Sequence, residues 1–271
     1  MPHPEPPQPV AAPRRFSWRR LVQYRLRTLL ILTTIIAVWF AWWSYTARQQ
    51  RVAVAALQKA GASVQYDFRL PLTGAMDDPP QWPKWLLNHV GVDYFGSVNA
   101  VEFRGAETTD AKLEYLKGLT TLQWLDLGGA EISDAGLVDL KGLTALQGLG
   151  LGGTPVTDAG LKHLAVLKAL QGLSLDNTLI TDAGVEYLKK LTSLEKLDLH
   201  NTQVTDAGLK YLNSLTGLET LQLENTQVTD AGLEHLKGLI ALQLLFLDGT
   251  PVTDAGVARL KQSLPNCNIR H

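Results

Sequence analysis

Seven aspartates recur along the chain at a constant spacing of 24 residues, and carboxylates are side chains that hard cations prefer. One carboxylate per repeat is too few for a calcium ion, which needs several oxygen ligands. Each aspartate also follows a serine or threonine, an arrangement typical of a helix N-terminus. We therefore expect a structural corner and no metal ion, with calcium binding as the alternative. The aspartates are Asp110, Asp134, Asp158, Asp182, Asp206, Asp230 and Asp254.

No pattern in the sequence predicts catalysis. It contains no G-x-S-x-G, H-E-x-x-H, Walker or dinucleotide-binding motif. The glycines at 148, 150, 152 and 153 alternate with leucines, as in a strand, and do not form a phosphate-binding loop. An open, solvated sheet would also do little to raise the pKa of a general acid. We expect a protein that is not an enzyme, with no catalytic residue and no cofactor.

The elements that position the aspartates follow the same period. Within each copy, L-x-L alternates with period two and predicts a strand, whereas D-A-G-L-x-x-L-x-x-L predicts a short helix or 3₁₀ turn. Val98, Val101 and Phe103 fill the leucine columns of the first copy. Neither element can bury its apolar face alone, so the copies must stack and share one core.

The repeated unit, L-x-x-L-x-L-x-x-T-x-V-T-D-A-G-L-x-x-L-x-x-L-x-x, resembles the leucine-rich-repeat family over residues 98–264. Its T-D-A-G-L segment is similar to the subtype found in cysteine-containing and F-box-associated repeat proteins. The resemblance implies an α/β fold: a right-handed leucine-rich-repeat solenoid with a parallel sheet on its concave face and short helices on its convex face. The whole layout also resembles membrane-anchored bacterial leucine-rich-repeat proteins.

Two repeated positions at each turn predict structural roles. The column of Thr154 and its equivalents has hydroxyls that can satisfy backbone groups turning away from the sheet. Gly160 and its equivalents are expected to serve close packing more than a positive φ, because Lys112 occupies the same place in the first copy.

Residues 28–47 contain no charged side chain and, at 1.5 Å per helical residue, span about 30 Å, the thickness of a bilayer core. Trp39, Trp42, Trp43 and Tyr45 lie at the C-terminal end, where aromatic rings favour the headgroup level. These features predict one transmembrane helix. A buried core helix and a cleaved signal peptide are the alternatives.

Charge predicts the orientation of this helix. Six arginines closely precede residues 28–47, whereas Arg48, Arg51 and Lys59 follow. Positive residues stay on the cytoplasmic side, so we expect a single-pass protein with a cytoplasmic N-terminus and a periplasmic or extracellular repeat domain. Residues 98–271 carry 14 Lys and Arg against 21 Asp and Glu, which argues against a nucleic-acid partner. The single cysteine, Cys267, excludes an internal disulfide, and with Ile269 it is expected to pack inward as a final half-strand.

The sequence divides into five predicted segments. Within the junction we expect a short helix closed by Gly61, a strand in SVQYDF, a proline-broken loop and a hydrophobic lid formed by Trp82, Trp85, Leu86, Leu87 and Val90. The proline-rich start of the chain is a spacer or a ligand for proline-motif receptors. The segments are a disordered Pro- and Arg-rich cytoplasmic tail (1–27), the transmembrane helix (28–47), the junction and N-terminal cap (48–97), seven repeats (98–264) and a C-terminal cap (265–271).

Function is expected on the concave face, where strand positions between the leucines vary from copy to copy. Exposed aromatic residues among carboxylates are typical of protein contacts. Leu244 and Phe246 could instead pack under the C-terminal cap, and glycines 148, 150 and 152 indicate either close approach of a partner or drift. The predicted partner-binding residues are Glu102, Trp124, Asp126, Asp176, Asp198, His200, Gln222, Glu224, Leu244 and Phe246.

These features predict a membrane-anchored recognition module that binds a protein or peptide ligand. The alternative is a structural or envelope scaffold that associates with itself. The sequence leaves open the identity of the partner, the oligomeric state and the pathway, as well as whether residues 28–47 are retained.

Overall fold

The computed structural model describes residues 18–67, 96–103 and 108–271, with side chains from residue 28 onward. The chain divides into two units, Met1–Thr46 and Ala47–His271. The second unit holds all of the repeats and is the part that positions a candidate site.

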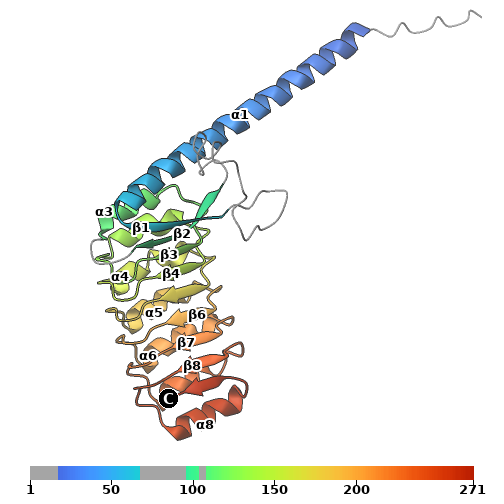
Figure 1. The fold of residues 1–271 in the computed structure, drawn as a ribbon. Helices are drawn as coiled ribbons and strands as arrows, with labels where there is room; N and C mark the ends of the chain where they lie inside the picture. Colours follow the sequence, from blue (N-terminus) through green and yellow to red (C-terminus); the bar gives the residue numbers. More distant parts are fainter. Residues whose placement is uncertain (1–17, 68–95, 104–107) are drawn as a thin grey trace, which may run out of the picture. The chain divides into compact units, whose positions relative to one another are not determined.

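One nine-stranded sheet runs through the second unit in sequence order, β1 to β9 (Figure 1). From β2 onward every pair is parallel, and each repeat aligns with the next at the same position, as in Leu125 beside Leu149. Short strands suffice because each strand from β2 to β8 is hydrogen-bonded on both sides. The strands are β1 Ala62–Asp67, β2 Ser97–Phe103, β3 Trp124–Asp126, β4 Gly148–Gly150, β5 Gly172–Ser174, β6 Lys196–Asp198, β7 Thr220–Gln222, β8 Leu244–Phe246 and β9 Asn268–Arg270.

Short α- and 3₁₀-helices return the chain from each strand to the next along the other side of the core (Figure 1). The prediction of a short helix or 3₁₀ turn after each T-D-A-G is confirmed. The helices of the repeats are α3 Asp110–Leu113, η2 Glu114–Leu116, η3 Gly136–Gly142, α4 Asp158–Leu161, η4 Leu164–Val166, α5 Asp182–Leu188, α6 Asp206–Leu209, η5 Lys210–Ser214, α7 Asp230–Leu233, η6 Glu234–Leu236 and α8 Asp254–Ser263.

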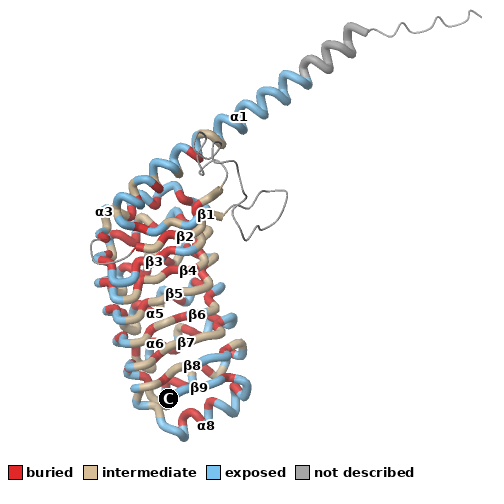
Figure 2. The backbone as a smooth tube through the Cα atoms, viewed as in Figure 1, coloured by how far each residue is buried: buried red, intermediate tan, exposed pale blue. Residues whose placement is uncertain are grey.

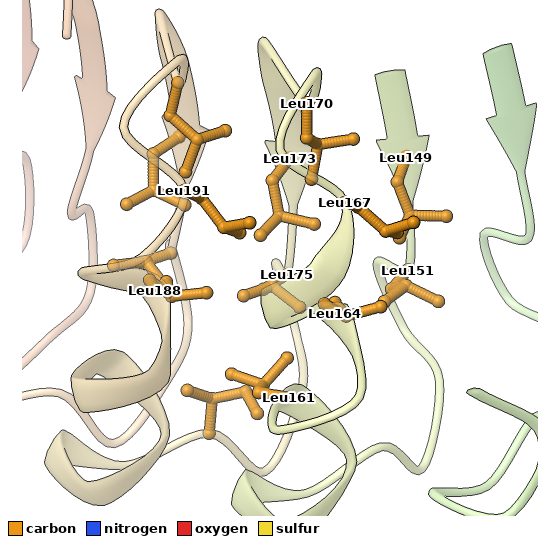
Figure 3. Close-up of a cluster of buried hydrophobic side chains, with 14 of the residues drawn as sticks. Leu149, Leu151, Leu161, Leu164, Leu167, Leu170, Leu173, Leu175, Leu188 and Leu191 are labelled. Atoms are coloured by element: carbon orange, nitrogen blue, oxygen red, sulfur yellow. The ribbon is translucent and has the colours of Figure 1, made fainter. Parts of the chain in front are cut away.

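Leucines fill the space between the sheet and the helices and form one continuous core. Leu149 lies beside Leu167 and Leu151 beside Leu164 of the following helical segment (Figure 3). Buried and accessible residues alternate around each turn (Figure 2). Because every repeat buries its leucines against its neighbours, the array is stabilised mainly by contacts between adjacent repeats.

The two ends of the sheet are closed differently. At the start, β1 pairs antiparallel with β2, and Val54 and Leu57 of the preceding helix are buried in the same core. At the end, β9 adds a last parallel strand with Cys267 and Ile269 buried, which confirms the predicted half-strand. The strand in SVQYDF is also confirmed, but its antiparallel pairing was not predicted.

The N-terminal helix, α1, extends over Trp18–Lys59 as one continuous element. Residues 18–27, predicted as part of a disordered tail, are therefore helical, and the short helix predicted after residue 48 is the end of α1. No glycine or proline occurs between Trp18 and Lys59, so nothing in the backbone interrupts the helix where its side chains turn from apolar to polar. The helix ends before Gly61, which has φ 87°.

Among the described residues, one helix contains a segment long and apolar enough to cross a membrane, Thr28–Lys59. Its most apolar window has a mean hydropathy of 1.6 and is not buried in the protein (Figure 2). This exposure contradicts the alternative of a buried core helix. The proline-rich start of the chain, the arginine side chains before residue 28, the proline-broken loop and the predicted hydrophobic lid lie outside the described residues.

Candidate binding surface on the open sheet face

The outward-pointing residues of β2 to β8 form a surface that we name the open sheet face. Alternation along each strand separates this face from the core: in β3, Trp124 and Asp126 are exposed while Leu125 is buried. The same positions in the other repeats differ in side chain, whereas the leucines do not. The open sheet face thus differs from one repeat to the next, while the core beneath it does not.

We call the T-D-A-G turn at the start of each helical segment the corner of the repeat. The aspartate of each corner bonds the corner of the next repeat and holds the two repeats in register. Oδ1 of Asp134 accepts the Thr157 backbone N–H at 2.8 Å, and Oδ2 accepts the Thr157 hydroxyl at 2.6 Å. Thr157 Oγ1 accepts in turn from the Ala159 N–H at 3.3 Å and caps the helix. The same bonds join Asp110–Ser133, Asp158–Thr181, Asp182–Thr205, Asp206–Thr229 and Asp230–Thr253.

These bonds show why the aspartates recur. Both carboxylate oxygens of each of these six aspartates accept hydrogen bonds from the next repeat, which argues against the calcium alternative. Asp254 has no following repeat and instead bonds His271 Nε2 at 2.7 Å. The predicted N-cap bond is confirmed from Ser133 to Thr253, whereas Thr109 in the first repeat makes no side-chain cap bond. The bond to the next repeat adds a role that the sequence did not show.

The small residue at each corner is explained by the same carboxylate. A Cβ on Gly160 would overlap Oδ1 of Asp134 and lie 2.9 Å from Leu137 Cδ1. The first repeat has no corner aspartate before it, and Lys112 occupies the position of the glycine. Its Nζ lies 3.2 Å from the Ala60 carbonyl oxygen. The prediction that Gly160 serves close packing is confirmed.

The threonine column is also confirmed as structural. Thr154 is buried, and its hydroxyl donates to the Leu151 carbonyl at 2.7 Å. Thr178, Thr202, Thr226 and Thr250 repeat the bond to the residue three positions earlier.

The open sheet face contains a hollow of about 640 Å³, lined by residues from β1 to β7. This volume is in the range of sites for small ligands or for side chains of a partner. Six of the ten predicted partner-binding residues line it: Glu102, Trp124, Asp126, Asp176, Asp198 and Gln222.

Glycines form the floor of the hollow, and the structure gives a reason for them. A Cβ on Gly148 would overlap the Trp124 ring, and one on Gly150 would overlap the Asp126 carboxylate. Gly152 is similarly placed under Asp176. The glycines therefore accommodate neighbouring side chains, a reason different from both partner approach and drift.

A hydrogen-bonded group borders the hollow at the ends of β5 and β6. Oδ1 of Asp198 accepts from the His200 backbone N–H at 3.0 Å and from Nδ1–H at 2.9 Å. Asp176 accepts from the Ser174 hydroxyl and from Asn177 Nδ2. Burial lowers the pKa of His200, but the bond to Asp198 and the charges of Asp198, Asp176 and Glu224 outweigh it, so the pKa lies above its usual value.

The ligand atoms of Asp176, Asp198 and His200 lie within 4.8 Å of one another, and among the described residues this is the group that could hold a metal ion. Hydrogen bonds already hold all three side chains: Asp198 bonds His200, and Asp176 bonds Ser174 and Asn177. The absence of a metal site therefore stays a prediction.

The four remaining predicted residues lie outside the hollow. His200 and Glu224 lie on the neighbouring column at the ends of their strands. Leu244 is exposed on β8, and Phe246 is half-buried with the Arg270 guanidinium 5.4 Å from its ring centre. The contact between β8 and the last strand supports the cap alternative for Phe246.

Sequence reasoning missed other residues that line the hollow, notably Lys196, Ser63 and Gln65. Lys196 occupies the same column as Trp124, so its position was readable from the repeat. Ser63 and Gln65 belong to β1, whose pairing depends on a contact distant in sequence.

Comparison with known proteins supports the architecture. A family model described as leucine-rich repeats in two copies matches residues 168–211 and 192–240, and a single-repeat model matches residues 118–141. These segments are leucine-rich repeats. No curated protein sequence matches the chain.

Three solved structures are similar to this chain, and one of them supports the fold. Internalin C2 from Listeria monocytogenes is 24% identical, with 80% of this chain and 91% of that chain covered and a TM-score of 0.53. Another internalin of that species is 28% identical (58% and 49% covered, TM-score 0.48), and a leucine-rich-repeat protein of Leptospira interrogans is 25% identical (58% and 45%, TM-score 0.45). The chain spans about half of the latter two proteins, and the likeness to internalin C2 concerns the fold alone.

Proposed function

We propose that the leucine-rich repeats form a non-enzymatic recognition module that binds a protein or peptide through the open sheet face. The observation that supports this function is the hollow in which an exposed tryptophan, Trp124, lies among the carboxylates of Asp126, Asp176 and Asp198. Exposed aromatic side chains in a concave, charged setting are typical anchors for a partner. The corners, by contrast, use their polar groups internally.

The proposal includes attachment to a membrane through residues 28–47, with the N-terminus in the cytoplasm. It is supported by the length of α1 and by the exposed apolar side chains of its first part, such as Ile35 and Trp42. Arginine bias supports the orientation. The T-D-A-G-L segment supports placing these repeats in the subtype of cysteine-containing and F-box-associated proteins.

A pull-down from native membranes tests the binding function. The full-length protein is compared with Trp124→Ala and with Asp198→Lys, and captured proteins are identified by mass spectrometry. Ile240→Ser is the matched control, because Ile240 is 84% exposed and does not line the hollow. We expect one partner to be retained by the wild type and the control and lost by both face variants. Equal capture by all four proteins would overturn the proposal.

Thiol labelling tests the orientation. Cys267 is buried, and burial raises the pKa of its thiol, so it reacts poorly in the folded protein. Ile240→Cys introduces an accessible thiol on the repeat domain. We expect a membrane-impermeant maleimide to label this variant in intact cells and to leave the wild type unlabelled; labelling only after lysis would contradict the orientation.

Self-association as a structural scaffold is the second candidate function. It is supported by β9, an end strand of the sheet with one pairing partner, because such a strand has backbone groups available to a second chain. Sedimentation of the full-length protein in uncharged detergent separates the candidates. A dimer would favour the scaffold, whereas a monomer at all concentrations would exclude it.

A further inference from the structure

The hollow carries a net negative charge beside an aromatic surface. Four of its lining residues are carboxylates, namely Glu102, Asp126, Asp176 and Asp198, and Lys196 is the one lysine or arginine in the described lining. A hollow with this charge balance attracts cations and repels anions. Trp124 is 51% exposed, so a large part of its ring is available to a ligand.

Trp124 and Asp126 lie close enough together to contact the same group of a ligand. They stand two residues apart on β3, about 7 Å, and point to the same face. Both lean toward β4, where Gly148 and Gly150 have no side chain to push them away. The ring and the carboxylate thus lie along the same floor.

The carboxylates are held in position with acceptor capacity remaining. Oδ1 of Asp126 accepts the Gly128 N–H at 2.9 Å, and Oδ1 of Asp198 accepts both bonds from His200. Within the described part of the chain, no protein hydrogen bond engages Oδ2 of Asp126 or of Asp198. An ionised carboxylate fixed by one oxygen is ready to accept charge-assisted bonds with the other.

We propose that this hollow receives an arginine side chain of the bound protein or peptide, with its guanidinium stacked on Trp124 and paired with Asp126. The inference rests on the proposed binding function and names the chemistry of its partner. A guanidinium is planar, weakly hydrated and always charged, so it can stack on an indole and donate to a carboxylate at once. A lysine ammonium has no flat surface that could stack on the indole. A neutral ligand gains little electrostatic energy from the other three carboxylates, Glu102, Asp176 and Asp198.

The test uses the full-length protein in micelles of an uncharged detergent with EDTA present. The probe is the blocked pentapeptide Gly-Gly-Arg-Gly-Gly, and the matched probe replaces arginine with citrulline, which has nearly the same shape and no charge. Binding is followed through the NMR signal of the Trp124 indole N–H, assigned with Trp124→Phe. We expect the arginine peptide to shift this signal. The citrulline peptide should bind at least about tenfold more weakly, which corresponds to a difference in binding free energy of about 1.4 kcal/mol.

A pair of variants separates the site from general charge. Asp126→Asn is expected to weaken the arginine peptide about tenfold, a loss typical of a charged contact. Glu234→Gln removes one carboxylate on the helical side, outside the hollow, and is expected to leave binding unchanged. Melting curves establish that both variants fold. The comparison of the arginine and citrulline peptides uses the wild type, so it does not depend on the folding of a variant.

The outcomes distinguish this inference from the proposed function. If the arginine and citrulline peptides bind equally while Trp124→Ala still releases the native partner, the arginine preference is wrong and the binding function stands. If no peptide shifts the Trp124 signal and no face variant alters partner capture, both proposals are wrong.

Discussion

The corners of the repeats and the open sheet face use glycine in the same way and with different consequences. At the corners, Gly160 and its five equivalents each lie against the aspartate of the preceding repeat. On the open face, the three glycines of one repeat, Gly148, Gly150 and Gly152, lie against Trp124 and Asp126 of the preceding repeat and Asp176 of the following one. In both places the missing Cβ makes room for a side chain from a neighbour.

The difference lies in repetition. A contact that recurs at every corner serves every repeat equally, so its role is to hold the stack together. A contact that occurs once cannot be required by the stack and marks a local feature, here the floor of the hollow. Four substitutions test this distinction, from the largest expected effect to the smallest.

Removing a corner carboxylate should destabilise the array most. Asp182→Ala deletes two hydrogen bonds to Thr205 and leaves its helix cap without an orienting partner. We expect the free energy of unfolding to fall by about 3 kcal/mol, measured by urea denaturation. Asp254→Ala is the control, because no repeat follows Asp254; an equal loss in the control would contradict the role in joining repeats.

Filling a corner should cost somewhat less. Gly160→Ala forces a methyl group against the Asp134 carboxylate, and we expect a loss of about 2 kcal/mol from overpacking. Gly172→Ala is the matched substitution on the open face, because no atom lies within 4 Å of its Cβ position. It should be neutral or slightly stabilising in the same assay. Equal destabilisation by both would show that the corner contact is not what matters.

Filling the floor should affect binding more than stability. Gly148→Ala displaces the exposed Trp124 ring, which can rotate toward solvent, so we expect a loss below about 1 kcal/mol. The arginine peptide should nonetheless bind about tenfold more weakly, because ring and carboxylate no longer lie on one floor. Unchanged peptide affinity with a displaced Trp124 NMR signal would contradict the role of the floor.

The smallest effect concerns pH and the group beside the hollow. The folded-state pKa of His200 is raised, so its stabilising contribution is present below the unfolded pKa and is lost as pH rises through the folded pKa. The wild type should therefore exceed His200→Gln in melting temperature more at pH 5.5 than at pH 8.5. A difference independent of pH would mean that the charge of His200, facing Asp198, Asp176 and Glu224, contributes nothing.

One repeated position shows a signal that was present in the sequence and not used. The residue at the turn after each of the strands β3 to β8 has a positive φ, such as 69° at Gly129 and 54° at Asn177. Glycine and asparagine are the residues that adopt this conformation most readily, and no other type occurs there from the second repeat to the last. The column could have been identified as a left-handed turn from residue type alone.

The sequence by itself determined the leucine-rich repeats, their alternation of strand and short helix, the buried leucine columns, the threonine bonds and the last strand around Ile269. These features follow from a strict period, because identical units must bury identical faces against one another. Six of the ten predicted face residues do line one hollow, for the same reason: alternation along a strand decides which side chains point outward.

Only the tertiary structure decided how those side chains meet. The bond from Asp134 to Thr157 joins residues 23 positions apart, β1 reverses direction against β2, and Trp124 leans over Gly148 rather than toward its other neighbour. A period states which residues face the same way and cannot state the direction in which each side chain tilts. That direction depends on the size of the neighbour across the strand gap, and here the neighbour is a glycine.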